Sequence, residues 1–252
     1  MAQRPRRISE GDVYHVVARG VSHSIIFEDD SDRTHFLDEL AKIFGEQSAN
    51  IYAWCLMDNH YHILVKLELN RLSEAMKRLN SSYALYFNTR YERDGHLFQG
   101  RFKSEAIDSD EYFLTTLRYI HQNPIKAGLA HTCDYRWSSY RAYAGDNAMY
   151  PSLTETNFAL KLLSGRAAFA RFHATADTTA TCCDIGRSRK LINDNHAKEV
   201  AEAVLGNLSL WSIASLPRKE RNAALRKLRN ANLSIRQIER LTGISRGIIA
   251  KS

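Results

Sequence analysis

Two β-prone runs separated by only two residues constrain the fold of this chain more than any other feature. The runs span residues 51–57 and 60–67 and contain several β-branched and aromatic residues. The connection is Asp58-Asn59, and both residue types tolerate the positive φ angles of a tight turn. We therefore expect an antiparallel β-hairpin in the first half of the chain.

The segments around the hairpin alternate between strand and helix patterns. In order they are a strand at 13–18, a helix at 31–44, the hairpin, a helix at 71–93, short strands within 97–107 and a helix at 109–122. Ser73 is expected to cap the second helix, and Pro124 is expected to end the third. This order predicts an α+β fold of the ferredoxin-like or RRM-like kind. We expect an antiparallel sheet with helices on one face plus a further helix, followed by a small all-α C-terminal region.

Charge divides the chain unevenly. The 252 residues carry 35 Lys and Arg against 28 Asp and Glu, a formal net charge of +7. Residues 1–150 contain 18 basic and 20 acidic residues, whereas residues 185–252 contain 14 and 5. A polyanion partner and a solvated helical face would both explain the basic end. We divide the chain into residues 1–145, a connecting segment at 146–184, and a basic helical region at 185–252.

Several features point to a cytoplasmic protein without a membrane partner. No window approaches 18 uncharged apolar residues, so no transmembrane helix is expected. The first residues contain arginines but no apolar stretch of the kind that forms a secretory signal. The four cysteines fit neither a zinc knuckle nor a disulfide framework, which favours a reducing compartment.

His60 and His62 stand two residues apart in the second strand of the hairpin. Because strand side chains alternate, both lie on one face, with Cα atoms about 7 Å apart, and Tyr61 points to the other. Two imidazoles at this separation can bind one divalent metal ion. The alternative is that both histidines are structural, since such a pair is common by chance.

Tyr119 and Asn123 stand four residues apart near the end of the helix at 109–122. They share a helix face, about 6 Å apart, if the helix persists to its last turn. An apolar stripe beside them can hold the helix on the sheet: Leu114, Leu117 and Ile120. The alternative is that Tyr119 is an aromatic at the core edge and Asn123 a helix-end residue before Pro124.

The basic end has the outline of a helix-turn-helix. Ser234 and Gln237 form a capping box that opens one short helix, and Gly243 supplies a tight turn before Ser245 caps another. The helix at 219–229 precedes them, and its expected inner residues are Ala223, Ala224, Leu225 and Leu228. An ordinary helical hairpin is the alternative. Candidate DNA contacts are Arg246 and Lys251 from the last helix, and Arg236 and Arg240 nearer the DNA backbone.

Four stretches of the sequence carry a family resemblance. They read Tyr-His-Val at 14–16 with Arg-Gly at 19–20, Met-Asp-Asn-His-Tyr-His-Ile-Leu-Val at 57–65, Gly-His-Leu-Phe-Gln-Gly-Arg-Phe-Lys-Ser at 95–104, and Tyr-Ile-His-Gln-Asn-Pro-Ile-Lys-Ala-Gly at 119–128. Together they resemble the single-tyrosine transposases of the His-hydrophobe-His nuclease superfamily. More specifically, they resemble the REP-associated tyrosine transposases, which act on repetitive extragenic palindromes. The resemblance covers about residues 5–145.

The resemblance implies a reaction and the residues that perform it. Tyr119 would attack a scissile DNA phosphate, giving a 5′-phosphotyrosine and a free 3′-OH. His60 and His62 would hold Mg²⁺ or Mn²⁺, with Asn123 as the third ligand. Related insertion-sequence enzymes have Gln at the Asn123 position, so the shorter amide matches the REP-associated branch. Tyr61 and Tyr112 are the rival nucleophiles.

The substrate expected from the resemblance is single-stranded hairpin or palindromic DNA, cleaved and rejoined by a nucleoid-associated protein. Four cations flanking the motifs are assigned to phosphate contacts, with ordinary surface roles as the alternative: Arg101, Lys103, Arg118 and Lys126. We expect a monomer, and a dimer remains possible. Two other functions stay open. One is a DNA-binding regulator that keeps the fold without the reaction, and the other is a metallohydrolase that does not use the tyrosine.

Overall fold

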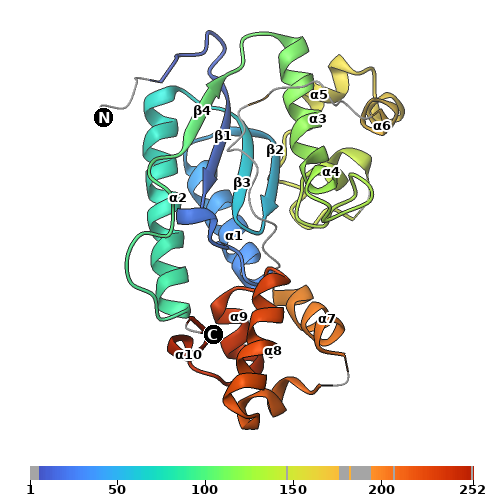
Figure 1. Cartoon of the computed structure of the whole chain (residues 1–252). Helices are drawn as coiled ribbons and strands as arrows, with labels where there is room; N and C mark the ends of the chain where they lie inside the picture. The colour runs from blue at the N-terminus through green and yellow to red at the C-terminus, as the bar shows by residue number, and fades with distance from the viewer. Residues whose placement is uncertain (1–5, 146, 176–181, 183–193, 207, 251) are drawn as a thin grey trace. The chain divides into compact units, whose positions relative to one another are not determined.

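The computed structural model describes residues 6–145, 147–175, 182, 194–206, 208–250 and 252. The chain forms two compact units. The first comprises residues 1–26 and 31–186, and the second comprises residues 27–30 and 187–252. In Figure 1 the sheet of the first unit is drawn in blue to green, and the helices of the second in orange and red.

The first unit is built around a four-stranded antiparallel sheet (Figure 1). Its elements are β1 (Val13–Arg19), a 3-10 turn (Val21–His23), α1 (Asp30–Glu46), β2 (Asn50–Met57), β3 (His60–Lys66), α2 (Leu69–Arg90), β4 (Lys103–Ala106), α3 (Asp110–Lys126), α4 (Tyr140–Ala144), α5 (Asn157–Leu162) and α6 (Arg166–Ala174). The strand order is β2-β3-β1-β4. The predicted α+β class is therefore confirmed.

The predicted hairpin is formed by β2 and β3, and an ion pair connects its turn to α1. Met57 pairs with His60 across the turn. Arg33 of α1 donates to Asp58 at 2.6 Å, and both side chains are buried. Asn59 donates its amide to the carbonyl of His23 at 3.3 Å. The turn is thus held by tertiary contacts as well as by its own sequence, which fixes the strand end that carries His60.

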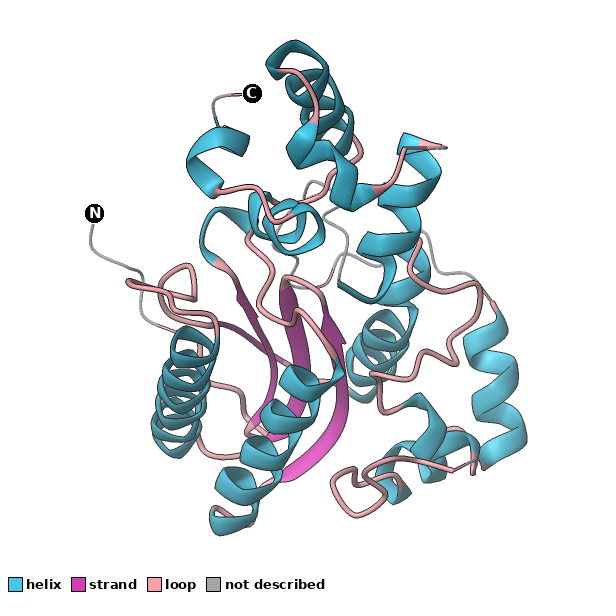
Figure 2. Cartoon of the chain, turned by 90° about the horizontal axis from the view of Figure 1, so that it is seen from below, coloured by secondary structure: helices cyan, strands magenta, loops and turns pink. Residues whose placement is uncertain are grey.

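Helices cover both faces of the sheet (Figure 2). On one face Tyr61 packs against Phe36 of α1, with ring centroids 4.7 Å apart, and Phe36 packs in turn against Tyr83 of α2 at 5.2 Å. On the other face α3 packs on β2, and Leu117 and Ile120 are fully buried there. The face that presents His60 and His62 is therefore the one that α3 covers.

The start of α2 differs from the prediction. Its N-cap is Glu68, whose carboxylate accepts from the backbone N–H groups of Asn70 and Arg71. Ser73, the predicted cap, lies inside the helix and donates to the carbonyl of Leu69 at 2.8 Å. The helix begins two residues earlier than predicted because a carboxylate at its N-terminus satisfies N–H groups that would otherwise lack partners.

The end of α3 corrects a second prediction. Ser109 caps the helix, accepting from the N–H of Tyr112 at 3.2 Å. Pro124, however, does not end the helix, which continues to Lys126. Proline this close to the C-terminus removes only one backbone hydrogen bond of the helix. The consequence is that Asn123 lies within regular helix, one turn after Tyr119.

The region that follows α3 contains helices that pack on it. Residues 146–184, interpreted as a connecting segment, include α5 and α6. Phe169 of α6 stacks on Tyr143 of α4 with ring centroids 4.8 Å apart, and both belong to the apolar cluster that contains Leu117. These helices have only six and nine residues, which accounts for the weak periodicity of this region.

The second unit is helical in its described part. Its elements are α7 (Asp194–Leu205), a 3-10 segment (Leu210–Ser215), α8 (Arg218–Asn230), α9 (Ile235–Thr242) and α10 (Arg246–Ala250). The capping box of Ser234 and Gln237 is present, and Gly243 adopts φ 69° at the end of α9. Leu225 and Leu228 of α8 are fully buried, whereas Ala223, predicted to be inside, is exposed.

Candidate active site

His60 and His62 lie side by side on β3, and Tyr61 lies on the opposite face, where its hydroxyl donates to Asn80 at 2.5 Å. The two imidazole centroids are 5.0 Å apart. Nδ1 of His60 is 2.7 Å from Oδ1 of Asn59. A carboxamide oxygen only accepts hydrogen bonds, so His60 carries its proton on Nδ1 and its lone pair on Nε2. Nε2 is therefore the atom of His60 that can bind a metal ion.

His62 is fully buried and bonded to a third histidine. Its Nδ1 is 2.9 Å from Nε2 of His15, which extends from β1 and is equally buried. Within the described part of the chain, Nε2 of His62 has no hydrogen-bond partner. Burial, together with the nearby His60 and His15, holds the pKa of His62 well below its usual value. His62 is therefore neutral near pH 7, the form that binds metal.

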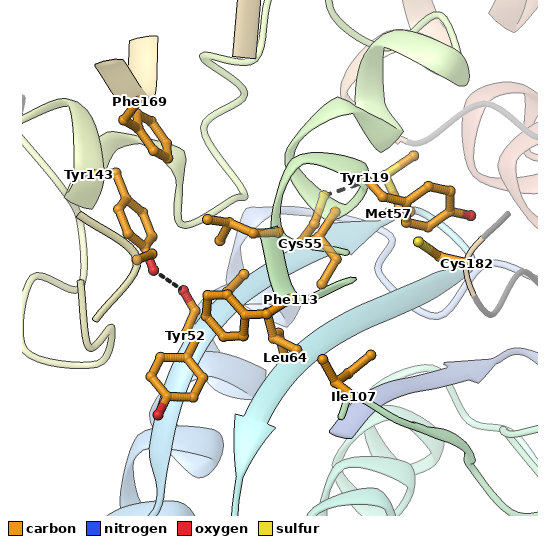
Figure 3. Packing of buried hydrophobic residues seen from close by; sticks show 14 residues of the cluster. Tyr52, Cys55, Met57, Leu64, Ile107, Phe113, Tyr119, Tyr143, Phe169 and Cys182 are labelled. Atoms are coloured by element: carbon orange, nitrogen blue, oxygen red, sulfur yellow. Dashed lines mark hydrogen bonds between the residues drawn. The ribbon is translucent and has the colours of Figure 1, made fainter. Parts of the chain in front are cut away.

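Helix α3 brings Tyr119 over these histidines. The Tyr119 ring meets His62 edge-on at a centroid distance of 5.8 Å and His15 at 6.0 Å. The phenol is buried at 6% exposure, and Figure 3 shows it beside Met57 and Cys182. Nζ of Lys126 lies 4.5 Å from the centroid of the same ring. The histidines of β3 and the tyrosine of α3 thus meet in one place.

Asn123 lies one helical turn beyond Tyr119 and is buried. Its Nδ2 donates to the carbonyl oxygen of Tyr119 at 3.0 Å, which fixes the side chain against its own helix. This bond uses the amide nitrogen, so Oδ1 is the atom that Asn123 can offer to a cation. Tyr119 and Asn123 thus stand one helical turn apart on α3, as the sequence predicts, and the structure adds a hydrogen bond between them.

These donor atoms fit a divalent metal ion. Neutral imidazoles and an amide oxygen are ligands that Mn²⁺ accepts. Mg²⁺ is usually held by few protein ligands, and water molecules and substrate oxygens fill its other coordination positions. The buried Nε2 of His62 is the observation that most favours a bound cation, because an unsatisfied buried polar atom is costly. Among the described residues, no group of three or more His, Cys, Asp or Glu forms an alternative metal site.

The two rival tyrosines are poorly suited to attack a phosphate. Burial, and then the carboxylate of Glu105, raise the pKa of Tyr112 above its usual value. Burial also raises the pKa of Tyr61, which the hydrogen bond to Asn80 only partly opposes, and this residue faces away from the histidines. A raised pKa makes the phenolate harder to form.

The cations assigned to phosphate contacts in the first unit are in different surroundings. Lys103 is exposed on β4 and pairs with Val17, which pairs in turn with His62, so Lys103 shares the face of the site. Arg101 is exposed just before β4, and Lys126 lies at the Tyr119 ring. The guanidinium of Arg118, in contrast, lies 4.3 Å from the centroid of the Phe172 ring of α6.

The cations proposed for the basic end are partly paired with acids. Within the second unit Arg240 forms an ion pair with Glu28 at 3.2 Å, and Arg246 forms one with Glu239 at 2.5 Å. The side chain of Arg236 and the whole of Lys251 lie outside the described residues. Both described arginines remain largely on the surface, with side-chain exposures of 38% and 49%.

Three residues of the site were missed by sequence reasoning: His15, Glu105 and Arg19. Arg19 pairs with His60 across the sheet, and its guanidinium donates twice to Oε1 of Gln99, at 2.9 and 3.2 Å. His15 pairs with Glu105, two rows further along the same face of the sheet. The only available signal was that His15 and Arg19 stand within a family-like stretch, because the pattern of a strand does not reveal its pairing partner.

The sheet, its histidines and the tyrosine of α3 have the arrangement expected of a single-tyrosine transposase. Residues 11–123 match the model of the family described as transposase IS200 like. This part of the chain includes all four strands and both Tyr119 and Asn123. These residues therefore form an IS200-like transposase domain, and the resemblance stated from the motifs is confirmed at that level.

Solved structures add to this comparison. The structure of a REP-associated tyrosine transposase bound to a REP hairpin has the same fold, with 18% identity and a TM-score of 0.50 over 62% of this chain and 93% of that chain. A Deinococcus radiodurans R1 protein described as a transposase aligns at 16% identity and a TM-score of 0.33, over 48% of this chain and 97% of that one. No curated protein matches the chain. None of the described helices is both long and apolar enough to cross a membrane.

Proposed function

We propose that this chain is a metal-dependent single-tyrosine transposase that cleaves and rejoins single-stranded hairpin or palindromic DNA of the REP type. The observation that carries the proposal is the position of Tyr119 over His62, with ring centroids 5.8 Å apart on the face that also presents His60. The family match supplies the class of reaction. The REP hairpin in the structure of the similar transposase supports the choice of DNA.

The residues divide the reaction between them. Oη of Tyr119 loses its proton to solvent and attacks the scissile phosphorus, the bond from phosphorus to the 3′-oxygen breaks, and the released 3′-oxygen takes up a proton from solvent. Attack of a 3′-OH on the phosphotyrosine reverses these steps and rejoins the strand. Lys126, 4.5 Å from the ring centroid, favours the negative charge that forms on the phenol oxygen.

A divalent ion held by His60, His62 and Asn123 would neutralise and orient the scissile phosphate. The protein prepares for it with a neutral imidazole on His62, since burial keeps the pKa of this residue low. Lys103 and Arg101 are the best-placed phosphate contacts beside this site, because both are exposed near the row that contains His62. Arg118, which lies on Phe172, is better suited to anchoring α6.

We further propose that one chain forms a complete site and that the second unit adds DNA affinity. The sheet and α3 of the same chain supply the histidines and Tyr119, so no second copy is required. In the second unit, α9 and α10 around Gly243 would contact DNA through surface arginines such as Arg246. This arrangement favours a monomer bound to one hairpin.

Trapping the covalent intermediate tests the proposal. The full chain is incubated with a labelled hairpin oligonucleotide and Mn²⁺, and the product is analysed under denaturing conditions. We expect an adduct with the unmodified chain and with Tyr112→Phe, and none with Tyr119→Phe. An adduct with Tyr119→Phe would show that Tyr119 is not the nucleophile.

The same assay separates the alternatives. A regulator that keeps only the fold would bind the hairpin without cleaving it, in the presence or absence of metal. A metallohydrolase that does not use the tyrosine would cleave without any trapped adduct. DNA binding by Tyr119→Phe, measured by fluorescence anisotropy, serves as the control that this variant is folded.

A further inference from the structure

His15 is the buried histidine behind His62. Its Nε2 is 2.9 Å from Nδ1 of His62, and the two rings stack with centroids 5.2 Å apart and an interplanar angle of 23°. Both side chains are fully buried. On its other side, Nδ1 of His15 is 3.8 Å from a carboxylate oxygen of Glu105, the residue that pairs with it on β4. The carboxylate of Glu105, the imidazole of His15 and the imidazole of His62 therefore follow one another in a line that ends at His62.

The hydrogen bond between the two imidazoles contains one proton, and its position decides what His62 can do. If Nδ1 of His62 holds the proton, Nε2 of His62 carries a lone pair. If Nε2 of His15 holds it, neutral His62 must carry a proton on Nε2 and cannot bind a metal ion there.

Glu105 selects between these arrangements. Its negative charge favours a proton on Nδ1 of His15, the nitrogen that faces it. A neutral His15 that is protonated on Nδ1 has a lone pair on Nε2 and accepts a hydrogen bond there. The proton of the shared bond then belongs to Nδ1 of His62, and Nε2 of His62 is left as a metal ligand.

We propose that His15 is a positioning residue that accepts the Nδ1 proton of His62 and, with Glu105 behind it, holds His62 in the tautomer and orientation that bind a divalent cation. The proposal rests on the proposed metal site but adds residues that the site did not include. Partners of this kind orient the ligand and change metal affinity by about 10–100-fold when they are removed.

The tautomer of His62 tests the proposal without any metal. In metal-free protein labelled with ¹⁵N-histidine, long-range ¹H–¹⁵N correlation spectra at pH 8 distinguish the protonated nitrogen of each ring. His62→Gln identifies the His62 signals by their loss. We expect a protonated Nδ1 and an unprotonated Nε2 in the unmodified chain. A protonated Nε2 on His62 would overturn the proposal directly.

Variants of His15 supply the second readout. His15→Phe keeps a ring but removes the acceptor, and we expect His62 to lose its fixed tautomer and Mn²⁺ affinity to fall by about 10–100-fold in calorimetry. His15→Gln retains an acceptor oxygen and should restore both properties to within about threefold of the original. His173→Phe, which disrupts another buried histidine pair, is the matched control and should change neither property.

The outcomes separate the two proposals. If the unmodified chain binds no Mn²⁺, the proposed metal site fails, yet the tautomer measurement still decides the role of His15. If Mn²⁺ binds and a folded His15→Phe protein binds it equally well, His15 does not position the ligand. Folding of each variant is checked from the same spectra, and the unmodified protein gives a decisive result even if His15→Phe does not fold.

Discussion

The first unit buries the polar groups that matter to its site, whereas the second carries its basic side chains on the surface. His15, His62 and the pair of Arg33 and Asp58 are all buried and bonded to one another or to the backbone around them. After residue 193, no Lys or Arg whose side chain the structure describes is buried. Buried polar groups are costly unless paired, so each of them fixes a particular geometry. Surface cations act additively on a polyanion and need no such precision.

The largest effect is expected from removing a metal ligand. His60→Gln should reduce the cleavage rate by about 10³-fold or more, because a bound cation is worth several kcal/mol of charge stabilisation and each 1.4 kcal/mol is tenfold. Hairpin affinity should stay within about twofold, since phosphate contacts dominate it. Single-turnover cleavage and anisotropy measure the two quantities. His131→Gln, an exposed histidine, is the control, and equal losses of cleavage in both variants would contradict the assignment.

Breaking the buried ion pair should affect the stability of the first unit almost as strongly. Arg33→Met removes the ion-pair partner of the buried Asp58, and we expect the free energy of unfolding to fall by about 3–5 kcal/mol in urea denaturation. Arg78 forms an exposed pair with Glu46, so Arg78→Met should cost no more than about 1 kcal/mol. Similar losses for both variants would show that burial does not distinguish these pairs.

Ending the chain at residue 186 tests the role of the second unit. The truncated protein should bind hairpin DNA about 10²-fold more weakly at low salt, and the slope of log affinity against log salt should fall by about 0.7 for each lost phosphate contact on single strands. Anisotropy between 50 and 200 mM salt measures both. A truncated chain that binds as tightly as the full chain would remove the basic end from DNA recognition.

Acid should destabilise the first unit more than the second. Burial lowers the pKa of His173 to about 4, below the unfolded value near 6.5. The unfolded chain therefore takes up a proton that the folded chain does not, so this stability is present above pH 6.5 and is lost as the pH falls towards 4. We expect a loss of about 2 kcal/mol between pH 7 and pH 5 in urea unfolding. His173→Gln should flatten this dependence, and a profile unchanged by the substitution would contradict it.

The smallest effect is expected at Arg246. Its pair with Glu239 is partly exposed, so Arg246→Ala should change the free energy of unfolding by at most about 1 kcal/mol. If Arg246 contacts a DNA phosphate, the salt slope should fall by about 0.7. Anisotropy titrations at several salt concentrations would detect this change, and an unaltered slope would exclude the contact.

The sequence predicted the elements that depend on local pattern and missed those that depend on neighbours. The hairpin follows from two β-prone runs with a two-residue break, although neither Asp58 nor Asn59 adopts the positive φ expected of the turn. Helix α3 follows from its apolar spacing and from the capping residue Ser109. The prediction that Pro124 ends α3 was wrong, because a proline does not show how far a helix continues beyond it. The short helices α5 and α6 lack strong periodicity and depend on aromatic contacts such as Phe169 on Tyr143.

Local pattern was enough to show that His60 and His62 share a strand face, that Tyr119 and Asn123 share a helix face, and that the basic excess lies at the end of the chain. Each of these follows from the fixed repeat of a strand or helix, or from simple counting. The folded chain was needed to show that α3 lies over the histidine face, that His15 is bonded to His62, and that Glu105 stands behind His15. Strand pairing and helix packing are set by burial and contacts between distant segments, which no local pattern contains.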